Sequence, residues 1–151
     1  MDFVFKHFEN LSTDELYKLL QLRARIFIVE QNCPYLDLDD KDRTSLHLLG
    51  YENQNLVAYS RILPPGICYE EASIGRVIVD KTFRGKNAGK ELMQKSIDLT
   101  LSAFNTNRIV ISAQQYLEKF YKDLGFVTES EAYMEDFIPH IKMRLVKNNL
   151  Q

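Results

Sequence analysis

The spacing of apolar residues changes within the first thirty positions of the chain. Residues 4–8 (VFKHF) mix β-branched and aromatic side chains, as strands do. From Ser12 onward the spacing becomes helical, and four apolar residues recur on one face: Leu16, Leu19, Leu20 and Phe27. Glu15 follows Ser12 by three positions, which is the spacing of a capping box. The sequence therefore predicts a strand and then an amphipathic helix that Ser12 opens.

Two charged residues interrupt the apolar face of this helix. Arg23 lies four positions before Phe27 and Glu30 three positions after it, so a helical repeat places all three on one side. Charged side chains on an apolar face need partners, because burying an unpaired charge is costly. We therefore expect either a buried ion-pair network of Arg23 and Glu30 or a functional site at this face.

The rest of the chain alternates between loop, strand and helix patterns. Residues 31–45 show no periodicity and are predicted to form a loop. Apolar segments predict further strands at residues 46–51, 56–62, 72–79, 108–112 and 137–146. A helical pattern begins at Ala88, and a short helix over residues 114–126 should end at Gly125. This order predicts a mixed α/β (α+β) fold, with residues 1–151 forming a single domain.

Composition and charge narrow the function classes. The 151 residues are 45% hydrophobic and carry a formal net charge of −2, so nothing resembles the basic surface typical of nucleic-acid binding. The N-terminus lacks a signal-peptide pattern, and no apolar run approaches the roughly 18 residues of a membrane span. Cys33 and Cys68 do not have metal-ligand spacing. We expect a cytoplasmic protein that binds no nucleic acid, membrane or metal.

The glycine-containing stretch FRGKNAGKEL, residues 83–92, is the first candidate site. It is not a P-loop, because only three residues separate Gly85 from Gly89, and Glu91 stands where a P-loop has Ser or Thr. A helix that begins near residue 87 would still offer unpaired amides and the positive end of its dipole to an anion. The alternative is a solvated turn in front of a surface helix.

Three cations strengthen the interpretation of this stretch as an anion site. Arg84, Lys86 and Lys90 all lie within seven positions. Side-chain cations beside helix-start amides are a common way of holding phosphate. The stretch therefore predicts a phosphate site, without indicating which phosphate compound binds.

The segment RVIVDKTFRGKNAGKELM resembles motif A of the GNAT superfamily of acyl-CoA-dependent N-acyltransferases. The match runs over Arg84, Asn87 and Gly89, with Asn87 in place of the family's first glycine. Asparagine tolerates a left-handed backbone better than most residues, so the departure is mild. A second GNAT motif is similar to QQYLEKFYKDLGF, where Gln114 stands for an asparagine and Leu117 for an alanine. Segments along nearly the whole chain look like the ElaA-type branch of the superfamily.

This resemblance implies a fold and a co-substrate. The fold would have a central mixed, mostly antiparallel sheet, flanked by helices, whose fourth and fifth strands splay apart around acetyl-CoA. The pantetheine arm would lie along Val77, Ile78 and Val79, with Gln114 as a further contact. The Val79 amide would polarise the acetyl carbonyl. The pyrophosphate would bind the backbone of seven residues: Arg84, Gly85, Lys86, Asn87, Ala88, Gly89 and Lys90.

The resemblance also implies catalytic roles. Tyr121 matches the family's general acid, and a phenol with a pKa of about 10 can protonate a departing thiolate. Its alternative role is packing against the core. The general base is open: Glu30 is one candidate, and Glu71 with Ser73 at the start of the fourth strand is another. Glu30 could equally belong to an ion-pair network.

Three residues are candidates for binding the acceptor substrate: Arg23, Arg76 and His140. Arg76 lies inside an apolar strand, so it binds either an acceptor carboxylate or a carboxylate of the protein such as Glu30. His140 could line the acceptor site or be hydrogen-bonded structure. His47 is expected to be structural.

The function expected from the resemblance is acetyl-CoA-dependent N-acetylation of a small-molecule amine or an exposed amino group. A non-catalytic acyl-CoA binding or sensing module on the same fold is the alternative, and a nucleotide-phosphate binder is a weaker third option. Exposed strand edges make either a monomer or a homodimer plausible.

Overall fold

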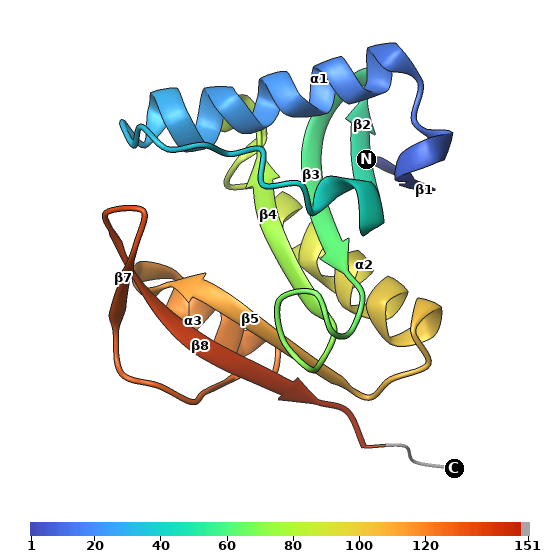
Figure 1. Cartoon of the computed structure of the whole chain (residues 1–151). Coiled ribbons are helices and arrows are strands. Elements are labelled where there is room, and N and C mark those ends of the chain that lie inside the picture. Colours follow the sequence, from blue (N-terminus) through green and yellow to red (C-terminus); the bar gives the residue numbers. More distant parts are fainter. Residues whose placement is uncertain (149–151) are drawn as a thin grey trace.

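Two antiparallel sheets form the centre of the molecule (Figure 1). A computed structural model describes residues 1–148. The first sheet contains, in spatial order, β1 (Asp2–His7), β2 (Leu46–Glu52), β3 (Asn55–Leu63) and β4 (Ser73–Val79). The second contains β5 (Arg108–Gln114), β8 (Ile138–Val146) and β6 (Val127–Thr128), and β7 (Tyr133–Glu135) also pairs with β8. The predicted mixed α/β fold with mostly antiparallel strands is confirmed.

The two sheets touch through β4 and β5 at one end only. Ala72 forms a parallel bridge with Ile109, and the Val110 amide donates a hydrogen bond to the Ala72 carbonyl at 3.0 Å. From this point the strands diverge toward Val79 and Gln114 (Figure 1). The expected splay of the fourth and fifth strands is therefore confirmed.

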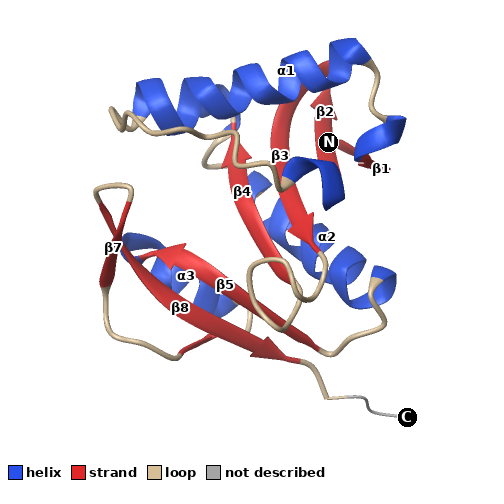
Figure 2. Ribbon diagram, in the orientation of Figure 1, coloured by secondary structure: helices blue, strands red, loops and turns tan. Residues whose placement is uncertain are grey.

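Helices cover the outer faces of the sheets (Figure 2). The α-helices of the described residues are α1 (Thr13–Arg23), α2 (Ala88–Ala103) and α3 (Glu118–Asp123). A π-helical segment, Ala24–Glu30, continues α1 directly. Single 3-10 turns occupy Phe8–Asn10, Asp42–Thr44, Lys81–Phe83 and Gln115–Leu117.

Local capping explains where α1 begins and where α3 ends. The Ser12 hydroxyl accepts from the Glu15 amide at 3.0 Å, and the Glu15 carboxylate accepts from the Ser12 amide at 2.8 Å, which confirms the capping box. At the end of α3, Gly125 has a φ of +106° and its amide bonds to the Lys122 carbonyl. The helix predicted for residues 114–126 is shorter than expected, because a 3-10 turn occupies its first positions.

Apolar layers lie on both faces of the first sheet. Adjacent residues of β3 point in opposite directions, so Ala58 belongs to one layer and Tyr59 to the other. The larger layer packs α2 against β3, β4 and β5, with Leu92 and Met93 fully buried. The smaller layer packs α1 and the π-helical segment against β2, β3 and β4.

The last strand expected at residues 137–146 is present as β8, and β7 precedes it to form a hairpin that was not expected. β7 and β8 pair from Tyr133↔His140 to Glu135↔Ile138. The two turn residues, Asp136 and Phe137, have φ values of +49° and +66°, as tight hairpin turns require. The sequence did not reveal β7, because a strand of three residues is too short to show an alternating pattern.

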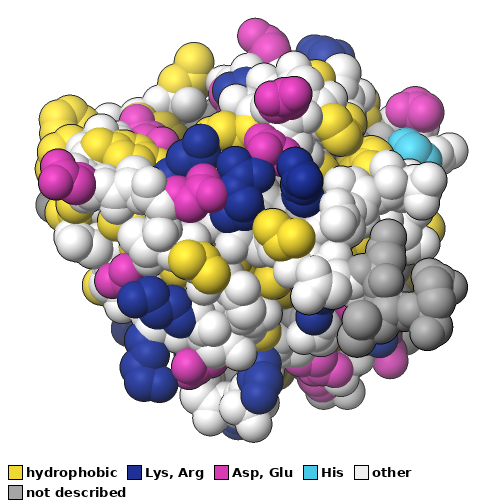
Figure 3. Space-filling view, turned by 90° about the horizontal axis from the view of Figure 1, so that it is seen from below, with side chains coloured by type: hydrophobic (Ala, Val, Ile, Leu, Met, Phe, Trp, Pro, Cys, Tyr) yellow, Lys and Arg dark blue, Asp and Glu magenta, His cyan; other side chains and the backbone are white. Residues whose placement is uncertain are grey.

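The surface mixes charges of both signs. On the face seen in Figure 3, basic side chains lie beside acidic ones. Within residues 1–148, no helix combines the length and the apolar character needed to cross a membrane.

Candidate active site

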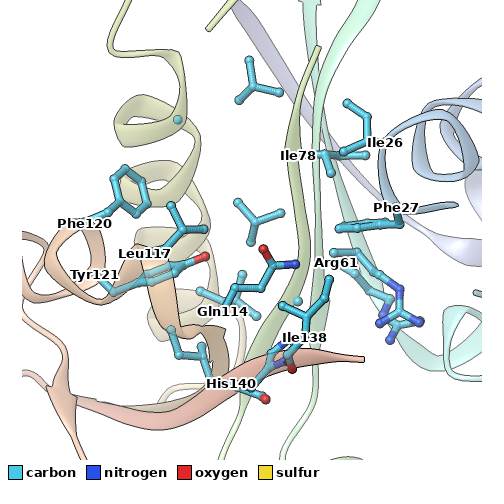
Figure 4. Close-up of a pocket in the computed structure, with 18 of the residues that line it drawn as sticks. Ile26, Phe27, Arg61, Ile78, Gln114, Leu117, Phe120, Tyr121, Ile138 and His140 are labelled. Carbon is cyan, nitrogen blue, oxygen red and sulfur yellow. Dashed lines mark hydrogen bonds between the residues drawn. The ribbon is translucent and has the colours of Figure 1, made fainter. Parts of the chain in front are cut away.

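The gap between β4 and β5 is a pocket of about 1080 Å³. Its walls come from segments far apart in the sequence: the π-helical segment, β4, the start of α2, β5, α3 and the β7–β8 hairpin. Figure 4 shows Ile78, Gln114, Tyr121 and His140 around one space. Most of the expected site residues line it, but Arg23 and Lys86 do not. The Lys86 ammonium instead lies 6.0 Å from the Phe83 ring centre.

A bulge bends β4 where it borders the pocket. β3 pairs Tyr59 with Ile78. Two residues later in β3, Arg61 pairs with Gly75, which lies three residues before Ile78 in β4. The extra residue breaks the regular pairing, and Arg76 has a φ of +51° in this bend. The bulge turns the Arg76 side chain toward the loop that precedes β2.

The backbone of β4 is open toward the pocket at Val79. The Asp80 amide donates to the Val57 carbonyl of β3 at 2.7 Å. Successive residues of an antiparallel strand direct their backbone groups alternately toward and away from the partner strand. Val79 therefore directs its N–H and C=O away from β3, while the backbone N–H and C=O of Ile78 point toward β3. On this open side, Arg84 Nε donates to the Val79 carbonyl at 2.9 Å.

The start of α2 offers backbone donors to the same space. The Glu91 amide makes the first bond of the helix, to the Asn87 carbonyl at 3.0 Å, so the amides of Ala88, Gly89 and Lys90 have no intrahelical partner. Within residues 1–148 the Asn87 side chain makes no capping hydrogen bond. With the positive end of the helix dipole, these amides form an anion cradle.

Two residues of the preceding loop give this cradle its shape. Asn87 has φ +59° and ψ 14°, the left-handed conformation that its asparagine was expected to tolerate. Gly85 has a φ of +80°. A Cβ on Gly89 would meet the Phe120 ring at 3.7 Å, an ordinary contact, so protein packing alone does not require glycine there. The residues present thus fit a phosphate group brought close to the backbone.

Glu30 lies in the pocket but is paired with Arg84 rather than Arg23. Glu30 Oε2 and Arg84 Nη1 are 2.7 Å apart, and both side chains are partly exposed. The expected ion pair of Arg23 and Glu30 was wrong, because the π-helical segment changes the residue spacing after Arg23. Arg84 in turn divides its guanidinium between Glu30 and the Val79 carbonyl.

Tyr121 is held in an aromatic cluster beside the pocket. Its ring packs edge-on against Phe120 at 5.1 Å and Phe126 at 5.9 Å. Only 6% of the residue is exposed, and burial raises the pKa of its hydroxyl above the ordinary value. Figure 4 shows the hydroxyl oxygen directed into the pocket. Nearby, Gln114 Nε2 donates to Gln31 Oε1 at 3.4 Å.

Beside the pocket lies a set of six charged residues that we call the arginine–aspartate network: Arg23, Arg61, Arg76, Asp37, Asp39 and Asp42. Of these, Arg61, Arg76 and Asp39 also line the pocket. Arg23 is fully buried, with Nε 2.8 Å from Asp37 and Nη1 2.7 Å from Asp42. A side chain with no exposed surface does not support the acceptor-binding role expected for Arg23.

The other two arginines complete the arginine–aspartate network. Arg76 Nε bonds to Asp37 at 2.7 Å, so Arg76 pairs with a carboxylate of the protein as expected, although the partner is Asp37 and not Glu30. Arg61 binds Asp39 through both terminal nitrogens, at 2.7 and 2.8 Å. Within residues 1–148, its Nε is buried without a partner.

Sequence reasoning missed the acidic half of this network and Arg61. A signal was present, because Asp37 and Asp39 alternate with Leu36 and Leu38 in the segment that was interpreted as a plain loop. Alternation places both carboxylates on one side of an extended chain. Burial by itself would raise the pKa of Asp39, but hydrogen bonds from Arg61 outweigh it and hold that pKa well below its usual range.

The remaining candidates separate into structural and pocket-lining residues. His47 is fully buried, with its ring nitrogens 2.6 Å from the Tyr59 hydroxyl and 2.8 Å from the Asp42 carbonyl, as expected of a structural histidine. Glu71 forms an ion pair with Arg144 and is not the free carboxylate that a general base requires. Ser73 is buried on the pocket wall.

His140 lies on the pocket wall formed by β8 and is 7% exposed. Its Nδ1 is 2.7 Å from the Ile138 carbonyl, and its Nε2 is 3.5 Å from Glu135. In the part of the chain that the structure describes, no group of three His, Cys, Asp or Glu side chains is arranged to hold a metal ion.

Comparisons with known proteins agree with this architecture. Residues 26–147 match the family model described as an acetyltransferase (GNAT) domain. Protein ElaA of Escherichia coli is 45% identical over 139 residues, which cover 91% of each chain. The crystal structure of Escherichia coli ElaA aligns with a TM-score of 0.89 at 42% identity, covering 95% of this chain and 98% of that one. An acyl-CoA N-acyltransferase from Pseudomonas aeruginosa aligns with a TM-score of 0.90 at 37% identity, covering 97% of this chain and all of the other.

Proposed function

Because the chain belongs to the GNAT acetyltransferase family, we propose that it transfers an acetyl group from acetyl-CoA to a primary amine. The transfer is a direct attack in a ternary complex, without an acetylated enzyme. The observation that carries the proposal is the opening between β4 and β5, which joins three unlike features in one pocket. These are the free backbone edge at Val79, the unpaired amides of α2 and the hydroxyl of Tyr121.

The start of α2 is proposed to bind the pyrophosphate of acetyl-CoA. The amides of Ala88, Gly89 and Lys90 supply donors that need no side-chain movement. The left-handed Asn87 and Gly85 let the loop curve around an anion. The same cradle suits any phosphate, but a nucleotide alone would leave the deeper part of the pocket empty.

The open edge of β4 is proposed to hold the pantetheine arm and the thioester. An extended chain of amides can pair with a free strand edge as another strand would. The N–H of Val79 points to this side and can donate to the acetyl oxygen as negative charge develops on it. Val77, Ile78 and Gln114 line the same stretch of pocket.

Tyr121 is proposed to protonate the departing sulfur. Burial keeps its hydroxyl in the protonated form because it raises the pKa. The neighbouring rings of Phe120 and Phe126 restrict its orientation. A fixed, protonated donor that faces the thioester is what the leaving group needs.

The alternative, a non-catalytic acyl-CoA binding module, draws support from Glu30. The ion pair with Arg84 occupies the carboxylate that was the first candidate for the general base. A protein without a base would bind acetyl-CoA and transfer nothing. The two functions therefore differ in turnover and not in affinity.

The test is release of free thiol from acetyl-CoA in the presence of a panel of primary amines. We expect wild-type protein to turn over at least one class of amine. Tyr121→Phe should reduce kcat by roughly 100-fold or more, while the Kd for acetyl-CoA changes little. Tyr17→Phe, on an exposed tyrosine of α1 that does not line the pocket, is the matched control and should leave kcat unchanged. Tight acetyl-CoA binding without turnover of any amine would favour the binding module.

A further inference from the structure

We infer that His140 is the general base of the proposed reaction, and that Glu135 positions it and stabilises its protonated ring. The inference rests on the proposed acetyl transfer. An amine at neutral pH carries an extra proton and cannot attack a carbonyl until a base removes it. His140 lines the pocket on the β8 side, next to Gln114 and Ile138 in Figure 4.

Hydrogen bonding selects the tautomer of His140. Nδ1 lies 2.7 Å from the Ile138 carbonyl, and a carbonyl oxygen can only accept. Nδ1 therefore carries the hydrogen, and Nε2 of the neutral ring carries the free electron pair. The basic nitrogen of His140 is thus the one that does not bond to its own strand.

Glu135 stands beside that basic nitrogen. Its Oε2 is 3.5 Å from Nε2, too far for a good hydrogen bond but close enough for an ion pair once the ring is protonated. The other oxygen, Oε1, accepts from the Ser112 hydroxyl at 3.2 Å, which orients the carboxylate. Half of the Glu135 side chain is exposed, so a proton can leave to solvent by this route.

The surroundings of His140 hold its ring in place. Tyr133 stacks on the ring with centres 6.3 Å apart and planes 23° apart. The Tyr133 hydroxyl lies 2.6 Å from Ser112 Oγ, so β5 and β7 brace each other beside the histidine. Two side chains that can carry charge, Glu135 and Tyr133 of β7, thus lie beside the His140 ring, while β5 contributes the uncharged Gln114 in register. Tyr69 lies within electrostatic range of both Glu135 and Tyr133.

Other carboxylates of the pocket are less able to serve as the base. Glu30 is bound by Arg84, and Asp39 by Arg61. Asp123 pairs with Lys119 at 3.1 Å. Asp136, at the tip of the β7–β8 hairpin, is the remaining acidic neighbour, and a control variant can test it separately.

The proton balance assigns a separate task to each residue. His140 Nε2 takes one proton from the ammonium and leaves a neutral amine. The amine nitrogen then forms a bond with the acetyl carbon, and the carbon–sulfur electron pair departs with sulfur. Sulfur takes the hydroxyl proton of Tyr121, and the second proton that the nitrogen loses restores that hydroxyl. His140 returns its proton to solvent past Glu135.

The test compares the pH profile of kcat/KM in wild-type protein and His140→Gln. At pH 7 the variant should lose roughly 100-fold or more in kcat/KM, because general-base catalysis contributes that much. The loss should shrink as the pH rises, because more of the amine is then already neutral in solution. Acetyl-CoA affinity and Tm should match those of the wild type.

Two further variants sharpen this experiment. Glu135→Gln removes the counter-charge of the imidazolium, so the acid limb of the profile should move to lower pH with a smaller loss of kcat/KM. Asp136→Asn keeps a residue type suited to its left-handed φ of +49° and should leave the profile unchanged. If His140→Gln fails to fold, the limb shift in Glu135→Gln alone decides the question.

The possible failures are distinguishable. If wild-type protein acetylates an amine and His140→Gln retains the same profile within about threefold, another base acts, and the assignment of His140 is wrong while the proposed function stands. An unshifted acid limb in Glu135→Gln overturns the role of the glutamate. If wild-type protein binds acetyl-CoA and acetylates nothing, the proposed function and this inference fall together.

Discussion

The arginine–aspartate network and the start of α2 are both polar regions near one pocket, but they differ in how far their groups are paired. Arg23 makes ion pairs with both Asp37 and Asp42. The other arginines of the network form ion pairs with the same set of aspartates. At the start of α2, the amides of Ala88 to Lys90 have no intrahelical partner. Apart from the buried Nε of Arg61, the charged groups of the first region are paired without a ligand, whereas the amides of the second region face the pocket.

This difference teaches how to separate scaffold from site. Charges that satisfy one another hold the loop of residues 31–45 against β3 and β4, and removing one leaves its partners buried and unpaired. Donors that face open space cost little in the free protein, because water can reach them, and they become useful when an anion arrives. Variants of the first region should therefore change stability, and variants of the second should change binding.

The largest expected effect is that of Arg23→Met on stability. Removing one partner of a buried ion pair costs about 3–5 kcal/mol, so the free energy of unfolding in urea should fall by that amount. Arg25→Met is the matched control: Arg25 is half-exposed and pairs with Asp80, so its loss should cost less than about 1 kcal/mol. Equal stability of the two variants would mean that the arginine–aspartate network does not support the fold.

Gly89→Glu should change binding without a comparable change in stability. The added carboxylate would face the proposed pyrophosphate, and like-charge contacts cost several kcal/mol, so the Kd for coenzyme A should rise roughly 100-fold. Calorimetric titration measures it. Gln94→Glu adds the same charge to an exposed position of α2 further from its start and should leave the Kd unchanged. If Gly89→Glu binds coenzyme A as the wild type does, this loop is only a turn.

The smallest effect concerns pH and Asp39. Its pKa is lowered in the folded protein, so its contribution to stability is complete above the unfolded pKa of about 3.9 and is lost as the pH falls below that value. Asp39→Asn should cost roughly 1–2 kcal/mol at pH 7, since the pair is partly exposed. Urea midpoints of the two proteins should converge between pH 4 and acid unfolding. A constant difference across this range would contradict the assignment.

Elements governed by neighbouring residues were predictable. Ser12 and Glu15 lie three positions apart, so the capping box that they form follows from a local rule. The same holds for Gly125 after α3 and for the left-handed Asn87 before α2. Each depends on the conformations that one or two residues allow.

Elements governed by distant partners were not predictable. The pairing of Glu30 was misjudged because α1 gives way to a π-helical segment. The partners of Arg76 lie 37 and 39 residues away, and the alternation of leucine and aspartate around them does not indicate which arginine they bind. The distance of His140 from Glu135 depends on the β7–β8 hairpin, and the three residues of β7 are too few to show a strand pattern in the sequence.

By itself, the sequence determined the mixed α/β fold, the helix start that can bind phosphate and the resemblance to the GNAT family, because periodicity, caps and motifs are local. Only the tertiary structure decided which charged side chains form ion pairs and which groups face the pocket. Ion pairs form by distance in space, and the chain brings residues such as Arg84 and Glu30 together across 54 positions. The chemistry of the site therefore depends on contacts whose sequence separation carries no signal.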